Sequence, residues 1–164
     1  MTNGNVPQPS PDRPPFNPLE IPAIAGTFAY RFNGYAMTQD RPFYILGVGQ
    51  LTIDTYGKIT GDHQSATTAI QGQDATVMTG EYTLTGQMTL TSSGAGGASI
   101  LFERKSGQGL NVLGNFFVQL AGDVDHFWMM SSKALTVNSE EAKFTGEAVE
   151  LASLEAVRMA LPKP

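Results

Sequence analysis

The chain carries, from residue 49 to residue 61, the stretch Gly49-Gln50-Leu51-Thr52-Ile53-Asp54-Thr55-Tyr56-Gly57-Lys58-Ile59-Thr60-Gly61. Leu51 and Ile53 alternate with polar residues, a pattern typical of a half-buried strand. The Thr55-Tyr56-Gly57 segment supplies residues that suit a turn, and a second β-rich run follows it. The stretch therefore predicts two antiparallel strands joined by a tight turn.

The same pattern of short β-rich runs and glycine-bearing turns continues along the rest of the 164-residue chain. Every connection is too short for a crossover helix, so consecutive strands are expected to pair antiparallel as a meander. The predicted strands are Thr27–Ala36, Phe43–Asp54, Lys58–Ala69, Ala75–Thr85, Gln87–Ser92, Ala98–Lys105, Leu110–Ala121, His126–Lys133 and Lys143–Leu151.

Such a sheet must protect its edge strands, and closing it into a barrel removes them altogether. We predict an all-β fold, an antiparallel up-and-down barrel of eight to nine strands, with a two-sheet sandwich as the alternative. The tail from Ser153 to Leu161 has a possible N-cap and apolar residues at helical spacing. It predicts a short C-terminal helix that ends before Pro162.

Proline is concentrated at the N-terminus, where seven of the ten prolines fall within the first 22 residues. Proline fixes φ and lacks an amide donor, which excludes a helix or an interior strand there. We therefore divide the chain into an extended arm, residues 1–22, and a barrel domain, residues 23–164. Phe16, Leu19 and Ile21 indicate that the arm lies on the body or on a neighbouring subunit, which predicts a homodimer or higher homo-oligomer. A proline-rich ligand for a recognition domain is the alternative.

Composition excludes several classes of function. The chain has no cysteine, which rules out thiol nucleophiles, disulfides and cysteine-ligated metals, and its two histidines do not stand at metal-ligand spacing. A formal charge of −5 argues against nucleic acid and anionic membranes as partners. Neither a membrane-spanning run nor a signal-peptide pattern is present. We expect a cytoplasmic protein that uses no cofactor or metal.

The strand faces predicted to point into the barrel carry aromatic and methionine side chains, which suit an adaptable apolar lining for a hydrophobic small-molecule ligand. Tyr30, Tyr82 and Arg104 are the candidate catalytic residues, because a buried polar group must find a partner or a ligand. The candidate ligand-binding residues are Phe28, Phe32, Leu51, Met78, Met88, Phe102, His126, Trp128 and Met130.

Several of these placements have two interpretations. Gly47 and Gly49 leave volume that is either a cavity or a bend of the sheet. Arg104 either reaches inward or lies beyond the end of the barrel. Both faces of the strand at residues 126–133 are apolar, so periodicity does not decide which one faces inward. His63, between two polar residues, is expected to be solvated near a barrel mouth, whereas Glu81 and Glu103 fall on outer faces.

The stretch at residues 49–61, followed by the Thr79-Gly80-Glu81-Tyr82-Thr83-Leu84 hairpin segment, resembles small bacterial calycin-like barrels. Gly26-Thr27-Phe28 is similar to the Gly-x-Trp opening of lipocalins. The resemblance covers about a third of the chain and rests mostly on turn and packing residues. It implies a barrel that resembles either the allene oxide cyclase and spirotetronate cyclase barrels or the lipocalin and fatty-acid carriers.

We therefore expect a cofactor-free cyclase or isomerase that holds a polyketide-like or lipid-like molecule inside the barrel. Positioning would supply most of the rate, while Tyr30 or Tyr82 hydrogen-bonds the developing charge. A non-catalytic carrier with the same cavity is one alternative. A structural or assembly subunit with a filled barrel is the other.

Overall fold

A computed structural model describes residues 21–37, 42–71, 74–91, 93–106, 111–121, 124–132, 135–138 and 146–160. One short helix, α1 (Ile21–Ile24), precedes the strands. The strands are β1 (Gly26–Met37), β2 (Pro42–Ile53), β3 (Lys58–Gln71), β4 (Asp74–Leu90), β5 (Ala95–Arg104), β6 (Asn111–Leu120), β7 (His126–Ser131), β8 (Leu135–Asn138) and β9 (Gly146–Arg158).

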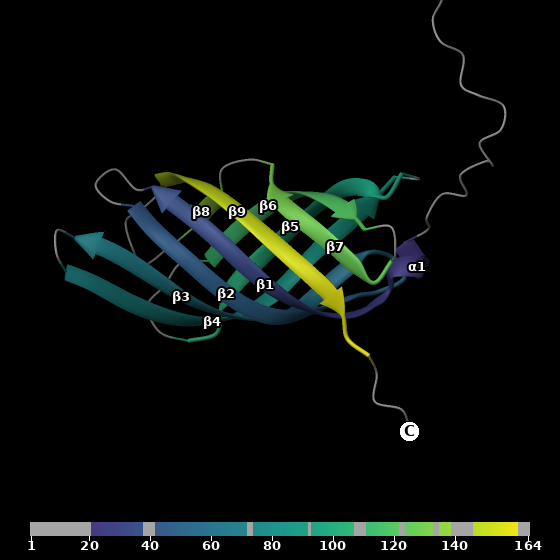
Figure 1. The fold of residues 1–164 in the computed structure, drawn as a ribbon, viewed down its shortest axis with the longest axis horizontal. Coiled ribbons are helices and arrows are strands. Elements are labelled where there is room, and N and C mark those ends of the chain that lie inside the picture. The colour runs from purple at the N-terminus through teal and green to yellow at the C-terminus, as the bar shows by residue number, and fades with distance from the viewer. Residues whose placement is uncertain are drawn as a thin grey trace, which may run out of the picture.

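The strands form one closed antiparallel barrel, as the sequence predicts. Neighbours along the chain pair from β1 to β7, and β9 closes the ring by pairing with both β7 and β1. Figure 1 shows β9 lying beside β1, with α1 at one end of the barrel. The sandwich alternative is therefore wrong.

The nine strands occupy eight positions around the ring. β6 pairs with β7 at residues 116–120 and with β8 at residues 111–113. β9 likewise pairs with β7 at residues 153–157 and with β8 at residues 146–148. β7 and β8 are thus two halves of the same barrel position, and β8 has no counterpart among the predicted strands.

The predicted C-terminal helix is wrong, because residues 153–158 belong to β9. Ala152, Leu154 and Ala156 are buried while Ser153 and Val157 are exposed, an alternation with the period of a strand. Without this segment, β1 would have an open edge. The stability gained by closing the ring therefore exceeds the local preference for a helix that the apolar spacing indicates.

The predicted break between the fourth and fifth strands is also absent, since β4 runs without interruption from residue 74 to residue 90. Gly86 lies within this strand opposite Ile100 of β5. A Cβ at Gly86 would lie 2.3 Å from the Ser99 carbonyl oxygen, so this glycine permits close approach of two strands.

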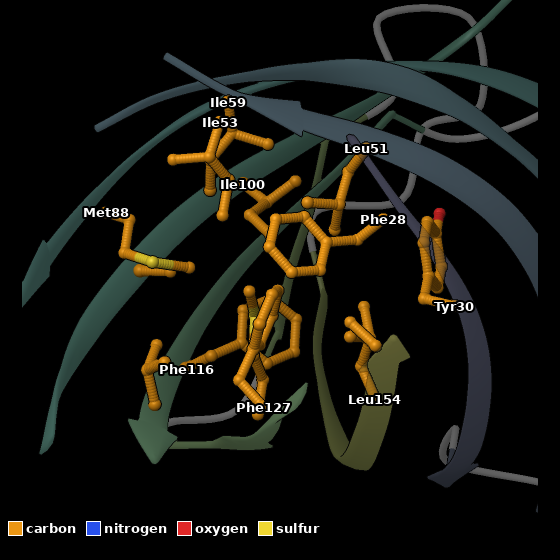
Figure 2. Packing of buried hydrophobic residues seen from close by; sticks show 14 of the residues in the cluster. Phe28, Tyr30, Leu51, Ile53, Ile59, Met88, Ile100, Phe116, Phe127 and Leu154 are labelled. Atoms are coloured by element: carbon orange, nitrogen blue, oxygen red, sulfur yellow. The ribbon is translucent and has the colours of Figure 1, made fainter. Parts of the chain in front are cut away.

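Apolar side chains fill the half of the barrel nearest α1. Figure 2 shows this core around Phe28, with Leu51 and Phe127 close by and Tyr30 at its edge. The two phenylalanine rings pack edge to face with centroids 4.9 Å apart. Ile24 of α1 is fully buried and belongs to the same cluster. This half of the barrel is therefore a packed core.

Arg158 ties α1 to the closed end of the barrel. Its guanidinium donates hydrogen bonds to the Ala23, Ala25 and Val124 carbonyl oxygens and to the Asp125 carboxylate. It also lies over the ring of Phe28, 4.8 Å from the centroid. One cation thus satisfies backbone carbonyls at the point where the chain enters β1.

Of the predicted arm, residues 1–20 lie outside the described part of the chain, and oligomerisation through the arm stays a prediction. The last two residues of the predicted arm, Ile21 and Pro22, belong to α1, so the exclusion of a helix is wrong at this end of the arm. Pro22 falls in the first turn, where its missing N–H is tolerated. Within the described ranges no helix has the length and apolarity needed to span a membrane.

Candidate functional site

A row of polar side chains crosses the barrel interior next to the apolar core, on the side away from α1. Strand register places Tyr30 of β1, Gly49 of β2, His63 of β3, Tyr82 of β4 and Arg104 of β5 opposite one another in sequence. Alternation along each strand turns these residues inward. We call this set the polar row.

The centre of the polar row is a hydrogen bond between Tyr30 and His63. The tyrosine hydroxyl lies 2.8 Å from Nδ1 of the imidazole, and the two rings are parallel with centroids 5.8 Å apart. Both residues are nearly inaccessible to solvent, with 5% and 4% exposure. Phe32 and Phe102 contact the imidazole edge to face. The pair is therefore held in an apolar cage.

Two glycines of β2 provide the space that these rings occupy. A Cβ at Gly49 would lie 2.7 Å from the Tyr30 hydroxyl oxygen. A Cβ at Gly47 would lie 2.2 Å from Cε1 and 2.7 Å from Nε2 of His63. The volume expected at these glycines is thus filled by the polar row, and the Nε2 edge of His63 faces a residue that has no side chain.

Burial perturbs both ionisable groups of the pair. Loss of solvent lowers the pKa of His63 to about 4, so the imidazole is neutral at neutral pH. Burial, with a smaller contribution from the Asp62 charge, raises the pKa of Tyr30 far above its usual value. The hydrogen bond therefore joins two neutral groups that each carry exchangeable protons.

Arg104 and Tyr82 form the other end of the polar row. Arg104 Nη1 lies 3.3 Å from the tyrosine hydroxyl oxygen, and its guanidinium carbon is 5.7 Å from the ring centroid. The guanidinium also donates hydrogen bonds to the backbone carbonyls of Ser106 and Thr79. Arg104 thus remains part of the barrel, and the alternative that it lies beyond the barrel end is wrong.

An open cavity of about 710 Å³ lies above the polar row, toward the barrel end opposite α1. Phe32, Gly47, Ser65 and Gly80 form the next row of register partners, and all four line it. Two of these four residues are glycines, so this row adds few side chains to the mouth of the barrel, although His63 lies against Gly47 and the Tyr82–Arg104 pair lies against Gly80. Arg104, which belongs to the polar row, also lines this cavity. The protein therefore combines a solid core at one end with a hollow mouth at the other.

The predicted ligand-binding residues fall into three groups. Phe28, Leu51, Met88 and Phe102 belong to the packed core. Phe32 lines the cavity, whereas Met78 is half exposed and is not a lining residue. His126, Trp128 and Met130 lie on the outer face of β7, because Phe127 and Met129 occupy its buried face.

The orientation that periodicity left open is thus the one with His126, Trp128 and Met130 outside, and these three residues do not line the barrel interior. His126 instead pairs with Glu155 on the outer wall, at 3.1 Å. The polar row contains all three candidate catalytic residues, Tyr30, Tyr82 and Arg104. Glu81 and Glu103 are exposed, as predicted.

The prediction that His63 is solvated is also wrong, since this residue is buried. Its polar neighbours Asp62 and Gln64 point outward and give the strand a solvated appearance. Pairing β3 with β2 would have revealed the burial, because His63 lies opposite Gly49.

Within the described ranges, no group of three or more His, Cys, Asp or Glu side chains is arranged to hold a metal ion. Comparison with protein-family models, with curated proteins and with solved structures finds no match to this chain.

Proposed function

We propose that the protein is a cofactor-independent isomerase or cyclase that binds an apolar small molecule in the mouth cavity. The observation that carries this proposal is the neutral, buried Tyr30–His63 pair beneath the glycine floor of that cavity. Burial of a titratable pair next to a cavity is costly for stability and is typical of functional sites.

His63 is the group that moves the proton. With a pKa of about 4, it is almost entirely in its basic form at neutral pH. The Nδ1 bond to Tyr30 orients the ring, and the Nε2 edge faces the cavity floor at Gly47. In the tautomer that leaves Nε2 unprotonated, this nitrogen can accept a proton from a bound molecule that reaches past Gly47, since His63 itself lies below the lining of the cavity.

The reaction needs no redox partner. A carbon–hydrogen bond next to a carbonyl breaks, the proton goes to His63 Nε2, and the electron pair moves onto the carbonyl oxygen. The proton then returns to a different carbon, so the product is an isomer of the substrate. Tyr82, whose oxygen accepts the Arg104 hydrogen bond, keeps its O–H group to donate to the developing oxyanion.

The mouth cavity suits a molecule of this kind. Its volume of about 710 Å³ falls within the range of small-molecule sites. The aromatic cage around His63 keeps water from the imidazole, which strengthens electrostatic interactions there. The resemblance to calycin-like cyclase barrels agrees with this proposal, and the up-and-down barrel supports it.

A non-catalytic carrier is the second candidate. One observation favours it: Tyr30 and His63 lie below the cavity and are not among its lining residues. A carrier would need the cavity alone, and the polar row would then serve only to fix the barrel shape. The filled lower barrel on its own would suit the structural subunit, but the open mouth argues against that function.

Deuterium exchange distinguishes an isomerase from a carrier. The protein is incubated in D2O with a panel of apolar β,γ-unsaturated ketones, with and without a terminal carboxylate, and products are followed by mass spectrometry. We expect enzyme-dependent deuterium uptake and double-bond migration.

His63→Gln should lower this rate about a hundredfold or more, since it removes the base but keeps a hydrogen-bonding side chain beside Tyr30. His126→Gln, which changes the histidine on the outer wall, serves as the matched control and should leave the rate unchanged. Equal rates for the wild type and His63→Gln would reject the isomerase and leave the carrier.

A further inference from the structure

We propose that the mouth cavity is specific for an apolar molecule that carries a carboxylate, and that Arg104 binds this group. The inference rests on the proposed function, because it names the class of molecule that the same cavity takes. It is carried by the charge and hydrogen bonding of Arg104, which do not depend on any role of His63 as a base.

Arg104 is a cation whose contacts in the described part of the chain are all neutral. Its bonds go to the Ser106 and Thr79 carbonyls and to the Tyr82 hydroxyl. The ion pairs among the described residues join Arg31 to Glu155, Lys105 to Asp62, His126 to Glu155 and Arg158 to Asp125. Arg104 thus stands at the cavity with an uncompensated charge.

The guanidinium is also held in place before any ligand arrives. Three acceptors bind one nitrogen each, and a guanidinium has five N–H groups, so two N–H groups remain for a ligand. A Cβ at Gly80 would lie 2.9 Å from Nη1, so the absence of a side chain there makes room for this group. A fixed planar donor of this kind fits a carboxylate better than a neutral carbonyl.

Two other charged residues border the cavity, and neither competes for this role. Arg31 projects from the outer face of β1, and its guanidinium is paired with Glu155. Glu81 is exposed on the outer face of β4. Phe32 contributes an aromatic ring to the cavity wall, and Gly47 and Gly80 contribute backbone without side chains. Among the described residues that line the cavity, Arg104 is therefore the inward-facing cation, and the wall around it is a mixture of polar and apolar groups.

A matched pair of fluorescent probes tests this inference. The probes are dansylamino-undecanoic acid and its methyl ester, which differ in charge but carry the same apolar chain. Titration of the wild-type protein should give at least about tenfold tighter binding of the acid, the usual effect of a charge-assisted hydrogen bond. Arg104→Met should remove this preference and leave binding of the ester unchanged, which also shows that the variant is folded.

Lys105→Met is the control, since it removes the neighbouring cation, which pairs with Asp62. It should keep the preference for the acid. If Arg104→Met binds neither probe, binding of the acid and the ester is measured for Arg104→Lys and Arg104→Gln instead. The first should keep most of the preference and the second should lose it.

The outcomes separate this inference from the proposed function. Equal binding of acid and ester by the wild type, or a preference that survives in Arg104→Met, overturns the inference and leaves the isomerase standing. An Arg104-dependent preference without any deuterium exchange supports the inference and rejects the isomerase. Absence of binding of both probes overturns both.

Discussion

Replacing His63 by glutamine should flatten the dependence of stability on pH. The buried imidazole has a pKa of about 4 in the folded protein, against about 6.5 in the unfolded chain. Between these two values the unfolded chain binds the proton more readily, so folding stability is complete above pH 6.5 and is lost as the pH falls toward 4. Glutamine does not titrate and still offers Tyr30 a hydrogen-bonding partner.

The size of the effect follows from this shift. Between pH 7.5 and pH 4.5 the wild type should lose about 2.5 kcal/mol of unfolding free energy through His63. The assay is urea denaturation at several pH values for the wild type, His63→Gln and His126→Gln. Only His63→Gln should show the smaller loss. Glu155 contributes below this range, because Arg31 lowers the pKa of its carboxyl group.

Parallel curves for the wild type and His63→Gln would refute this reasoning. They would mean that water reaches the imidazole and that its pKa is close to the ordinary value. The polar row would then be a solvated cluster, and the case for a buried proton-transfer pair would fail.

Four further substitutions test the packing around the site and the anchoring of α1 at the other end of the barrel. Gly47→Ala places a Cβ against His63 and should destabilise the protein by about 1–3 kcal/mol, measured as a shift of the urea midpoint; an unchanged midpoint would show that the imidazole can move aside. Tyr30→Phe leaves His63 Nδ1 without its partner and should cost about 1–3 kcal/mol by the same measurement, whereas a neutral effect would show that the bond adds no stability. Arg158→Met removes the hydrogen bonds that hold α1 and should lower the free energy of unfolding by about 3 kcal/mol. Arg31→Met, on an exposed ion pair, should change it by less than about 1 kcal/mol, and equal losses would contradict the role given to Arg158.

Local sequence signals predict most of this fold. The alternation of Leu51 and Ile53, the turn before Gly57 and the short connections are enough to indicate an antiparallel meander, and edge protection indicates closure. The prediction for the C-terminal segment is wrong because its apolar residues fit both the period of a helix and the period of a strand. Only pairing with β1, more than a hundred residues away, decides that Leu154 belongs to a strand.

The sequence predicts only part of the site, again because the pairing of distant strands is not visible in the local sequence. Alternation places Tyr30 and Tyr82 on inner faces from local sequence alone. The burial of His63 depends on two glycines in a neighbouring strand, and that pairing is not visible in the residues around the histidine. A residue whose local neighbours are polar is therefore misplaced until the register of the sheet is known.

The central claim is that the hollow mouth above the polar row is the ligand site. Isotope-edited NOE spectra of the protein with dodecanoate test it most directly. Our account predicts intermolecular NOEs from the alkyl chain to the ring of Phe32 and to the α-protons of Gly47 and Gly80, which line the mouth. NOEs confined to exposed apolar residues of the outer wall, such as Trp128 and Met130, would contradict it.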